Sequence, residues 1–237
     1  SLHDALPICY SEKDMERFRR NELASQDSTF CFECRMCGAC CRKRSEPVVL
    51  TGPDVFRVAR ALAVPIGEAV TRNMEYCLGA QSHAPVLYLS ERPDGSCRLL
   101  RNGKCTVQAD KPAVCALYPL GRYTDVRDGS VHYFVNPGAA CAGMDTEETR
   151  TLGDWMREFL LDETERDMEA WTSLAAGVVR VTSRMAEKDI SREMQAALLN
   201  ALYLNYDTAR PYAEQVEENK AVVRKEFRER WHKNIKF

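Results

Sequence analysis

The chain has 237 residues, of which 45% are hydrophobic and 29% charged, and its net charge is −2. This composition is typical of a globular protein with one large or two small domains. The near-neutral charge gives no basis for a nucleic-acid or anionic-membrane partner. Every apolar run is far shorter than the roughly 20 residues of a membrane span. We therefore expect a cytoplasmic protein that binds neither nucleic acid nor a membrane.

The beginning of the chain divides into two segments. Residues 1–8, SLHDALPI, resemble the in-frame translation of a common sequencing adapter, so we leave them out of the fold and regard Cys9 as doubtful with them. Residues 9–30 are polar with few apolar positions, and they predict a short helix or a loose lead-in segment. A cysteine-bearing domain is predicted to follow at 31–144.

Five cysteines crowd the stretch FCFECRMCGACC at 30–41: Cys31, Cys34, Cys37, Cys40 and Cys41. Disulfides would not use this spacing, because closing short loops contributes little stabilisation. A catalytic cysteine needs a nearby base, and His83, His132 and His232 lie in no recognisable signature. Metal ligation explains the set, because a Cys-x2-Cys turn brings two sulfurs to one soft metal, and Gly38 gives the backbone freedom for such a turn.

The next segment predicts short helices and a strand. Residues 48–64 run from a strand-like triplet into a helix, with Thr51 as its cap and Pro53 in its first turn. Residues 66–74 predict a second short helix, and PVLYLS at 85–90 predicts a strand.

Two hairpins and an irregular segment are predicted between 97 and 137. Residues 97–108 form the first hairpin candidate, because Asn102-Gly103 is the favoured pair for a tight type I′ turn. Residues 111–121 are bounded by prolines and are predicted to be irregular. Residues 121–137 predict a second hairpin that turns at Asp128-Gly129.

From Asp145 onward the chain has no cysteine, and apolar residues recur at helical spacing in four stripes. The stripes are Leu152, Trp155, Met156, Phe159 and Leu160; Trp171, Leu174, Ala175, Val178, Val181 and Met185; Met194, Ala197, Leu198, Ala201 and Leu202; and Val216, Val223, Phe227, Trp231 and Ile235. They predict a helical region at 145–237 that supplies packing and no metal ligand. The predicted fold class is therefore α+β, with a small, irregular cysteine-rich domain of short helices and hairpins followed by this helical region.

Four motifs occur in an order that resembles a known family. FECRMCGACCR (32–42) is similar to the pattern F-x-C-x2-C-G-x-C-C, and GSCRLLRNGKCTV (95–107) to a G-x-C-x-x-L hairpin with a second cysteine. KPAVCALYPL (111–120) is similar to R-P-x-x-C-x-x-[FY]-P, with Lys111 where arginine is usual, and ACAG (140–143) to a closing C-x-G. Together they resemble the YkgJ-type cysteine-cluster (CxxCxxCC) family, whose members are expected to chelate zinc or iron, and a branch of this domain occurs in flagellin lysine methylases.

The resemblance implies a set of eight ligands and leaves Cys31 and Cys77 outside it. The implied metal ligands are Cys34, Cys37, Cys40, Cys41, Cys97, Cys105, Cys115 and Cys141. Eight thiolates make two groups of four. A rival partition uses Cys31, because Cys31-x2-Cys34-x2-Cys37-x3-Cys41 has the spacing of a bacterial ferredoxin run, although Arg42 replaces the usual proline.

Two constraints bear on how the ligands divide. Adjacent residues tend to project in different directions, so we expect the sulfurs of Cys40 and Cys41 to lie too far apart to share one tetrahedral zinc or to form a disulfide. A two-residue turn at Asn102-Gly103 would place Leu100 opposite Cys105 and Cys97 opposite Gln108. Cys97 and Cys105 would then lie on opposite faces, unless a bulge intervenes or Cys97 precedes the strand.

The metal and the activity stay open at this level. An all-cysteine set without histidine favours an iron–sulfur cluster, with zinc as the alternative. Three hypotheses follow: an iron–sulfur protein for electron transfer or a radical or methyl-transfer reaction, a zinc-stapled module whose helical region contacts a protein partner, and a metal carrier or sensor. The sequence has no glycine-rich nucleotide motif after a strand, which counts against a self-contained methylase. Catalytic residues cannot be assigned, and whether the protein is an enzyme is undecided.

Overall fold

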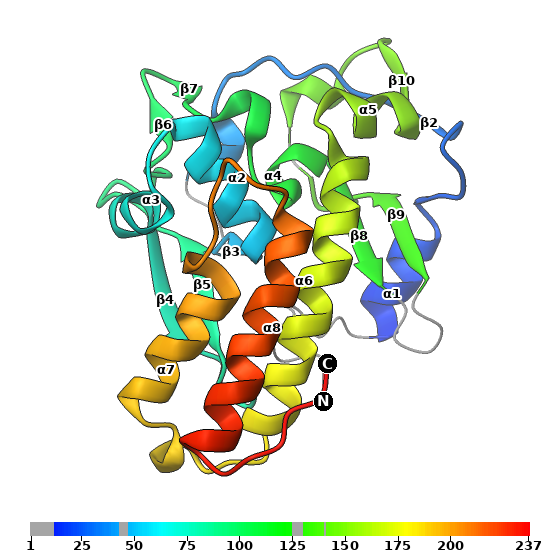
Figure 1. The fold of residues 1–237 in the computed structure, drawn as a ribbon. Helices are drawn as coiled ribbons and strands as arrows, with labels where there is room; N and C mark the ends of the chain where they lie inside the picture. The colour runs from blue at the N-terminus through cyan, green and yellow to red at the C-terminus, as the bar shows by residue number, and fades with distance from the viewer. Residues whose placement is uncertain (1–11, 43–46, 125–129, 140) are drawn as a thin grey trace.

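A computed structural model describes residues 12–42, 47–124, 130–139 and 141–237, and the predictions about 1–8 and Cys9 lie outside these ranges. The described chain is α+β, as the sequence predicts. Its helices are α1 (Glu12–Arg19), α2 (Gly52–Leu62), α3 (Ile66–Asn73), α4 (Ala113–Leu117), α5 (Leu152–Glu158), α6 (Leu161–Thr182), α7 (Arg192–Leu199) and α8 (Tyr212–Glu229). Figure 1 shows α6 and α8 side by side, with α2 at their upper end.

The strands form small antiparallel sheets. They are β1 (Glu22–Leu23), β2 (Thr29–Cys31), β3 (Val49–Leu50), β4 (Met74–Leu78), β5 (Pro85–Leu89), β6 (Leu100–Arg101), β7 (Lys104–Cys105), β8 (Leu120–Thr124), β9 (Val131–Val135) and β10 (Thr149–Thr151). Two sheets have three strands, in the orders β1-β9-β8 and β3-β5-β4, while β2 pairs with β10 and β6 with β7. In the β2–β10 pair Cys31 lies opposite Thr149. The segment that precedes the cysteine loop (residues 32–42) is therefore paired with the start of the helical region.

The predicted helix at 48–64 forms as α2, preceded by the short strand β3. Thr51 caps it in a full capping box: its hydroxyl accepts a hydrogen bond from the Asp54 N–H, and the Asp54 carboxylate accepts one from the Thr51 N–H. The helix ends at Leu62, where Ala63 adopts a left-handed conformation, with φ 52°. The first eight residues of α2 are all buried, which makes this helix part of the core.

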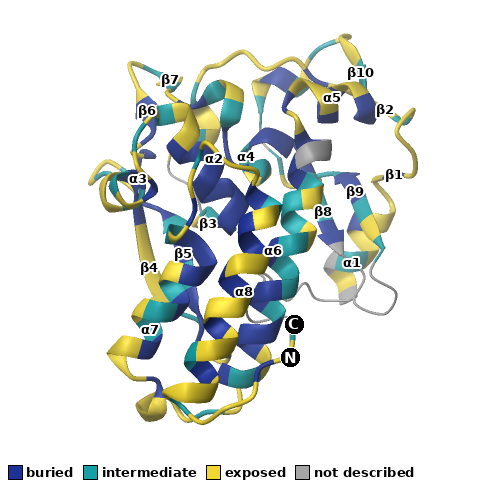
Figure 2. Cartoon of the chain, viewed as in Figure 1, coloured by how far each residue is buried: buried dark blue, intermediate teal, exposed yellow. Residues whose placement is uncertain are grey.

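One main core joins the middle of the chain to the helical region. Residues of α2, α3, β3, β4 and β5 pack in the same apolar cluster as residues of α6, α7 and α8. Figure 2 shows the buried faces of these elements turned toward one another and their exposed faces turned outward. The middle segment therefore buries more apolar surface than its short strands and loops suggest, because the helical layer covers it.

A second, smaller core surrounds Trp155 of α5. It gathers Phe30 and Phe32 from the segment that leads into the cysteine loop, and Ala116 and Leu117 from α4. The Trp155 indole N–H donates a 3.0 Å hydrogen bond to the Ala116 carbonyl oxygen, which fixes α4 against α5. The cysteine loop is thus attached to this second core at one side and to the main core at the other.

Three local predictions differ from the structure. Residues 111–121 are not irregular throughout, because Ala113–Leu117 forms α4. The last helix stops at Glu229, so Trp231 and Ile235 lie beyond it, although Ile235 is still buried in the main core. The third apolar stripe runs from α7 into a π-helical turn at Asn200–Leu204.

The second hairpin forms as β8 and β9, and its predicted turn at Asp128-Gly129 falls outside the described residues.

Candidate metal centre

Four of the implied ligands lie on the segment that follows β2. Cys34 and Cys37 are exposed in this loop, and Cys40 and Cys41 lie in a 3₁₀ turn over Ala39–Cys41. Gly38 precedes the turn with φ 70°, the left-handed conformation that glycine adopts without a steric penalty. The sequence-based role of Gly38 is confirmed.

Four cysteines form an inner group against the main core: Cys41, Cys97, Cys105 and Cys115. Cys97 is buried, and the other three are partly buried. The Cys97 N–H donates a 2.8 Å hydrogen bond to the Cys41 carbonyl oxygen, and Arg42 pairs with Ser96 in an isolated β-bridge, so the 3₁₀ turn is held against the segment before β6.

Electrostatic interactions link the sulfurs of the inner group. The pKa of Cys41 is raised far above its ordinary value by a hydrogen bond with the Cys40 thiol, by burial, and by the nearby Cys40, Cys105 and Cys115 sulfurs. Burial also raises the pKa of Cys105, with a smaller contribution from Cys97. These thiols are close enough to resist ionising together, and a bound cation is what would stabilise them as thiolates.

The hairpin prediction is half right. Leu100 lies opposite Cys105, and Asn102 and Gly103 both have positive φ, at 50° and 77°, as a type I′ turn requires. The strands β6 and β7 are only two residues long, however, so the pairing of Cys97 with Gln108 is wrong. Cys97 precedes the strand and bridges to Glu91, and it is therefore not forced onto the face opposite Cys105.

Three cysteines are electrostatic neighbours of the Tyr118 side chain. Burial raises the pKa of Tyr118, and so do the sulfurs of Cys141, Cys40 and Cys37, in that order. Cys141 packs partly buried against the second core. Cys34 belongs to the same exposed loop as Cys37. Sequence reasoning did not single out Tyr118, although it occupies the [FY] position of its motif.

The expectation that Cys40 and Cys41 lie far apart is wrong. Their Sγ atoms are 3.9 Å apart and are not joined in a disulfide. Two sulfurs that each lie about 2.3 Å from one tetrahedral zinc are about 3.8 Å apart, so this spacing is compatible with a shared ion. The 3₁₀ turn is the physical reason, because its tight winding keeps neighbouring side chains closer than an extended strand would.

Backbone N–H groups and cations surround the thiols. The Gly143 N–H donates a hydrogen bond to Cys141 Sγ at 3.4 Å, and the Val107 N–H donates one to Cys105. Arg92 donates to the Cys97 carbonyl oxygen at 2.5 Å, and Arg42 to the Cys37 carbonyl oxygen at 3.2 Å. Against the larger effect of burial, the Val107 N–H lowers the pKa of Cys105 and so favours its thiolate, the form that binds a soft metal or an iron–sulfur cluster.

The described thiols are neighbours rather than a closed cage. Within the described ranges, no three Cys, His, Asp or Glu side chains converge tightly enough to hold one metal ion. The assignment of all eight cysteines as ligands stays a prediction.

The remaining cysteines and histidines have other surroundings. Cys31 Sγ lies 3.9 Å from the Thr149 hydroxyl on β10, and Cys77 is exposed on β4. His132 Nδ1 pairs with Glu22 at 2.5 Å, and its ring stacks on Tyr123 with centroids 4.7 Å apart. His132 is thus held in β9 by its contacts with Glu22 and Tyr123.

Residues 33–147 match the model of the CxxCxxCC family, which is described as "Putative zinc- or iron-chelating domain". This segment belongs to that family. It contains all eight implied ligands of the CxxCxxCC domain and begins after Cys31. No curated protein and no solved structure shows significant similarity to the chain, so the relation to flagellin lysine methylases stays a prediction.

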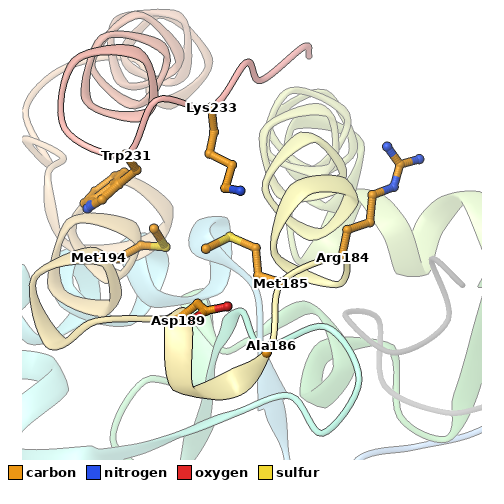
Figure 3. A pocket seen from close by; sticks show the side chains of 7 residues that line it. All are labelled: Arg184, Met185, Ala186, Asp189, Met194, Trp231 and Lys233. Carbon is orange, nitrogen blue, oxygen red and sulfur yellow. The ribbon is translucent and has the colours of Figure 1, made fainter.

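A hollow of about 290 Å³ lies away from the CxxCxxCC domain, in the helical region. Figure 3 shows Met185, Met194 and Trp231 around it, with the Lys233 ammonium directed into it. No cysteine of the described ranges lines it, and the ammonium would repel a metal cation. A protein partner for this region stays a prediction. None of the described helices combines the length and apolarity needed to cross a membrane.

Proposed function

We propose that the CxxCxxCC domain holds metal in two adjoining thiolate groups. The inner group is Cys41, Cys97, Cys105 and Cys115, and the outer group is Cys34, Cys37, Cys40 and Cys141. The observation that carries this division is packing: the inner four lie against the main core, whereas Cys141 lies against the second core and the other three are exposed. Cys40 is an electrostatic neighbour of Cys41 and Cys105 as well as of Tyr118, so it lies where the two groups adjoin.

The proposed cofactor is an iron–sulfur cluster, and the proposed activity is electron transfer. Such a cluster supplies one-electron redox chemistry when bound. The all-cysteine donor set supports it, as do the N–H groups of Val107 and Gly143, because hydrogen bonds to ligand sulfurs tune the potential of a cluster. The exposed outer group would give a partner protein access to the centre.

Zinc is the second candidate, and the Cys40–Cys41 pair favours it. The 3.9 Å between their sulfurs is close to the spacing of two ligands on one tetrahedral ion, so in this candidate Cys40 and Cys41 share one ion instead of belonging to separate groups. A zinc centre would hold the loops together without redox chemistry, because zinc has a single stable oxidation state in proteins.

Anaerobic purification of the full chain tests the two candidates. An iron–sulfur protein is expected to be brown, to contain iron and acid-labile sulfide, and to give an electron paramagnetic resonance signal that changes on reduction with dithionite. A colourless protein with stoichiometric zinc and no sulfide would replace the electron-transfer proposal by the structural one. A chain that holds neither metal would contradict both.

Separate Cys40→Ser and Cys41→Ser variants test the division into two groups. We expect each variant to lose part of the metal and the double variant to lose more than either, because the two sulfurs serve different groups. The measurement is elemental analysis per protein chain. Cys77→Ser is the matched control, because Cys77 is exposed on β4 and should leave the metal content unchanged. Equal losses in all three Cys40 and Cys41 variants would mean that the pair belongs to one group.

A further inference from the structure

Strand β4 is an exposed edge of the sheet β3-β5-β4. It pairs with β5 on one side, and no strand of the described ranges pairs with its other side. Glu75, Tyr76 and Cys77 are all exposed, and Figure 2 shows most of β4 in the colour of exposed residues. Many proteins protect such an edge with lysine, proline or a bulge, because a free edge can pair with a further strand. The sequence MEYCL has no lysine or proline, and its register with β5 runs without a bulge.

The hydrogen bonds at the two ends of the β4–β5 pair show which backbone groups point toward the free edge. Opposite residues of an antiparallel pair alternate between those that exchange hydrogen bonds and those that do not. The Ser90 N–H donates to the Asn73 carbonyl oxygen, and the Gly79 N–H donates to the Ala84 carbonyl oxygen, each at 2.9 Å. With this register the odd-numbered residues of β4 bond to β5, and the backbone groups of the even-numbered residues point away from it.

The outward backbone groups are arranged about Tyr76, the middle residue of β4. Tyr76 and Leu78 each direct an N–H and a carbonyl oxygen toward the free edge. Met74 directs its carbonyl oxygen there, while its N–H donates to the Val70 carbonyl oxygen at the end of α3. The donors and acceptors therefore match those of the same strand turned by 180° about Tyr76.

We propose that this edge joins two copies of the chain, with β4 antiparallel to β4 of the second copy about a two-fold axis at Tyr76. Tyr76 exchanges two backbone hydrogen bonds with Tyr76 of the second copy. The Leu78 N–H of each copy donates to the Met74 carbonyl oxygen of the other. A contact of this kind uses the same surface on both copies and closes after two of them. The two three-stranded sheets then form one sheet of six strands.

The side chains of β4 favour a second copy as the occupant of this edge. Glu75 is the only charged residue of the strand, and with this register it lies opposite Cys77 of the second copy instead of facing itself. Its carboxylate also keeps the hydrogen bond that it accepts from the Tyr88 hydroxyl at 3.2 Å. Tyr76 is 53% exposed, and the two copies of its ring would lie next to each other as an aromatic cross-strand pair, which stabilises a sheet.

The dimer is expected to be weak. Five residues from each copy make a smaller contact than the roughly 1,200–2,000 Å² of a stable interface. Interfaces of standard size have dissociation constants of about 1 μM or lower, so we expect a dissociation constant above about 1 μM here.

Opposite charges at Tyr76 test both the dimer and its register. Tyr76→Lys places two like charges opposite each other in the pair, and so does Tyr76→Glu, so each variant alone should dimerise poorly. A mixture of the two should form heterodimers, because a lysine then faces a glutamate. Both substitutions are at an exposed position and should leave the fold intact. Val222→Lys is the matched control, because Val222 is an apolar residue that is 50% exposed but lies on α8.

The measurement is sedimentation equilibrium of the full chain from about 1 μM to 1 mM, the range of a weak complex. A reducing agent prevents disulfides between exposed cysteines. We expect the wild type and Val222→Lys to shift from monomer toward dimer over this range. Each Tyr76 variant alone should associate at least about tenfold more weakly, since it loses the ring pair and gains a repulsion. Their mixture should regain the dimer.

Three results would overturn the proposal. A wild type that stays monomeric up to about 1 mM would show that the edge does not bind a second copy. If Tyr76→Lys associates as strongly as the wild type, the dimer uses another surface. If the wild type dimerises but the mixture of charged variants stays monomeric, Tyr76 does not face its own copy and the two-fold register is wrong. None of these outcomes depends on which metal the cysteines bind.

Discussion

Removal of the metal under reducing conditions is expected to expose the cysteine-bearing loops to trypsin while the main core stays protected. The segments at 32–42 and 91–106 contain few regular elements, and thiolate–metal bonds would replace the hydrophobic contacts that they lack. Arg35, Arg98 and Lys104 are exposed potential cleavage sites in these segments. We expect cleavage there to accelerate by at least about tenfold, because local opening controls proteolysis of a folded protein.

The main core, which is expected to stay protected from trypsin, provides an internal control for this experiment. Arg57 of α2 is 4% exposed, and it donates hydrogen bonds to the Thr164 hydroxyl at 2.7 Å and to the Phe159 carbonyl oxygen at 2.9 Å. This arginine should stay uncut, because the core shared with α6 does not depend on metal. Mass spectrometry of the fragments is the measurement. Loops that resist trypsin equally with and without metal would contradict the structural role of the thiolates, and early cleavage at Arg57 would contradict the independence of the core.

Substitution of Gly52 by alanine is expected to destabilise the whole chain by about 3 kcal/mol, the upper part of the range for overpacking a core. Gly52 is the first residue of α2, and it packs directly on the helical layer. An added Cβ would lie 2.5 Å from Trp171 Cδ1 and 2.6 Å from the Leu202 carbonyl oxygen, and it would also meet the Tyr212 hydroxyl. Backbone and indole atoms in a core cannot move aside as an exposed side chain can.

Gly67→Ala is the matched control for this substitution. Gly67 lies in α3 and is exposed, and a Cβ there would meet no atom within 4 Å. Alanine should therefore be neutral or stabilise by up to about 1 kcal/mol, because glycine is a poor helix former. Urea unfolding followed by circular dichroism measures both. A Gly52→Ala chain as stable as the Gly67→Ala chain would mean that α2 does not pack on Trp171 as described.

Local signals predicted the local structure well. The capping residue Thr51 and the Asn102-Gly103 turn both act as their sequence indicates, because each is decided by atoms within a few residues. The helical stripes were also reliable, since apolar positions that repeat every 3.6 residues fall on one face of a helix and on no single face of a strand. Several stripes continue after their helix has ended, as at Trp231 and Ile235 beyond α8. An apolar side chain can pack inward from an irregular segment, so the stripe alone does not locate a helix end.

Long-range relations could not be predicted from the sequence. Nothing in the sequence of α2 indicates that this helix packs against Trp171 and Leu202, which lie more than a hundred positions away. The closeness of the Cys40 and Cys41 sulfurs depends on a 3₁₀ turn that no motif specifies. Lys111 was noticed only as a departure from arginine, and its burial depends on Phe159 from another part of the chain. The set of eight predicted ligands follows from the resemblance to the family, whereas the proposed grouping of these cysteines depends on the fold.

The pairing of β2 with β10 determines how this protein can be dissected. Thr29–Cys31 comes before the family segment at 33–147 and Thr149–Thr151 comes after it, so the two strands join just outside both family boundaries. A fragment cut at those boundaries would lose both strands. A fragment extended to 29–151 would keep the pair but uncover the face of α2 that α6 and α8 bury. Neither piece is a transplantable module, and grafting the cysteine segment onto another protein would require grafting its helical cover as well.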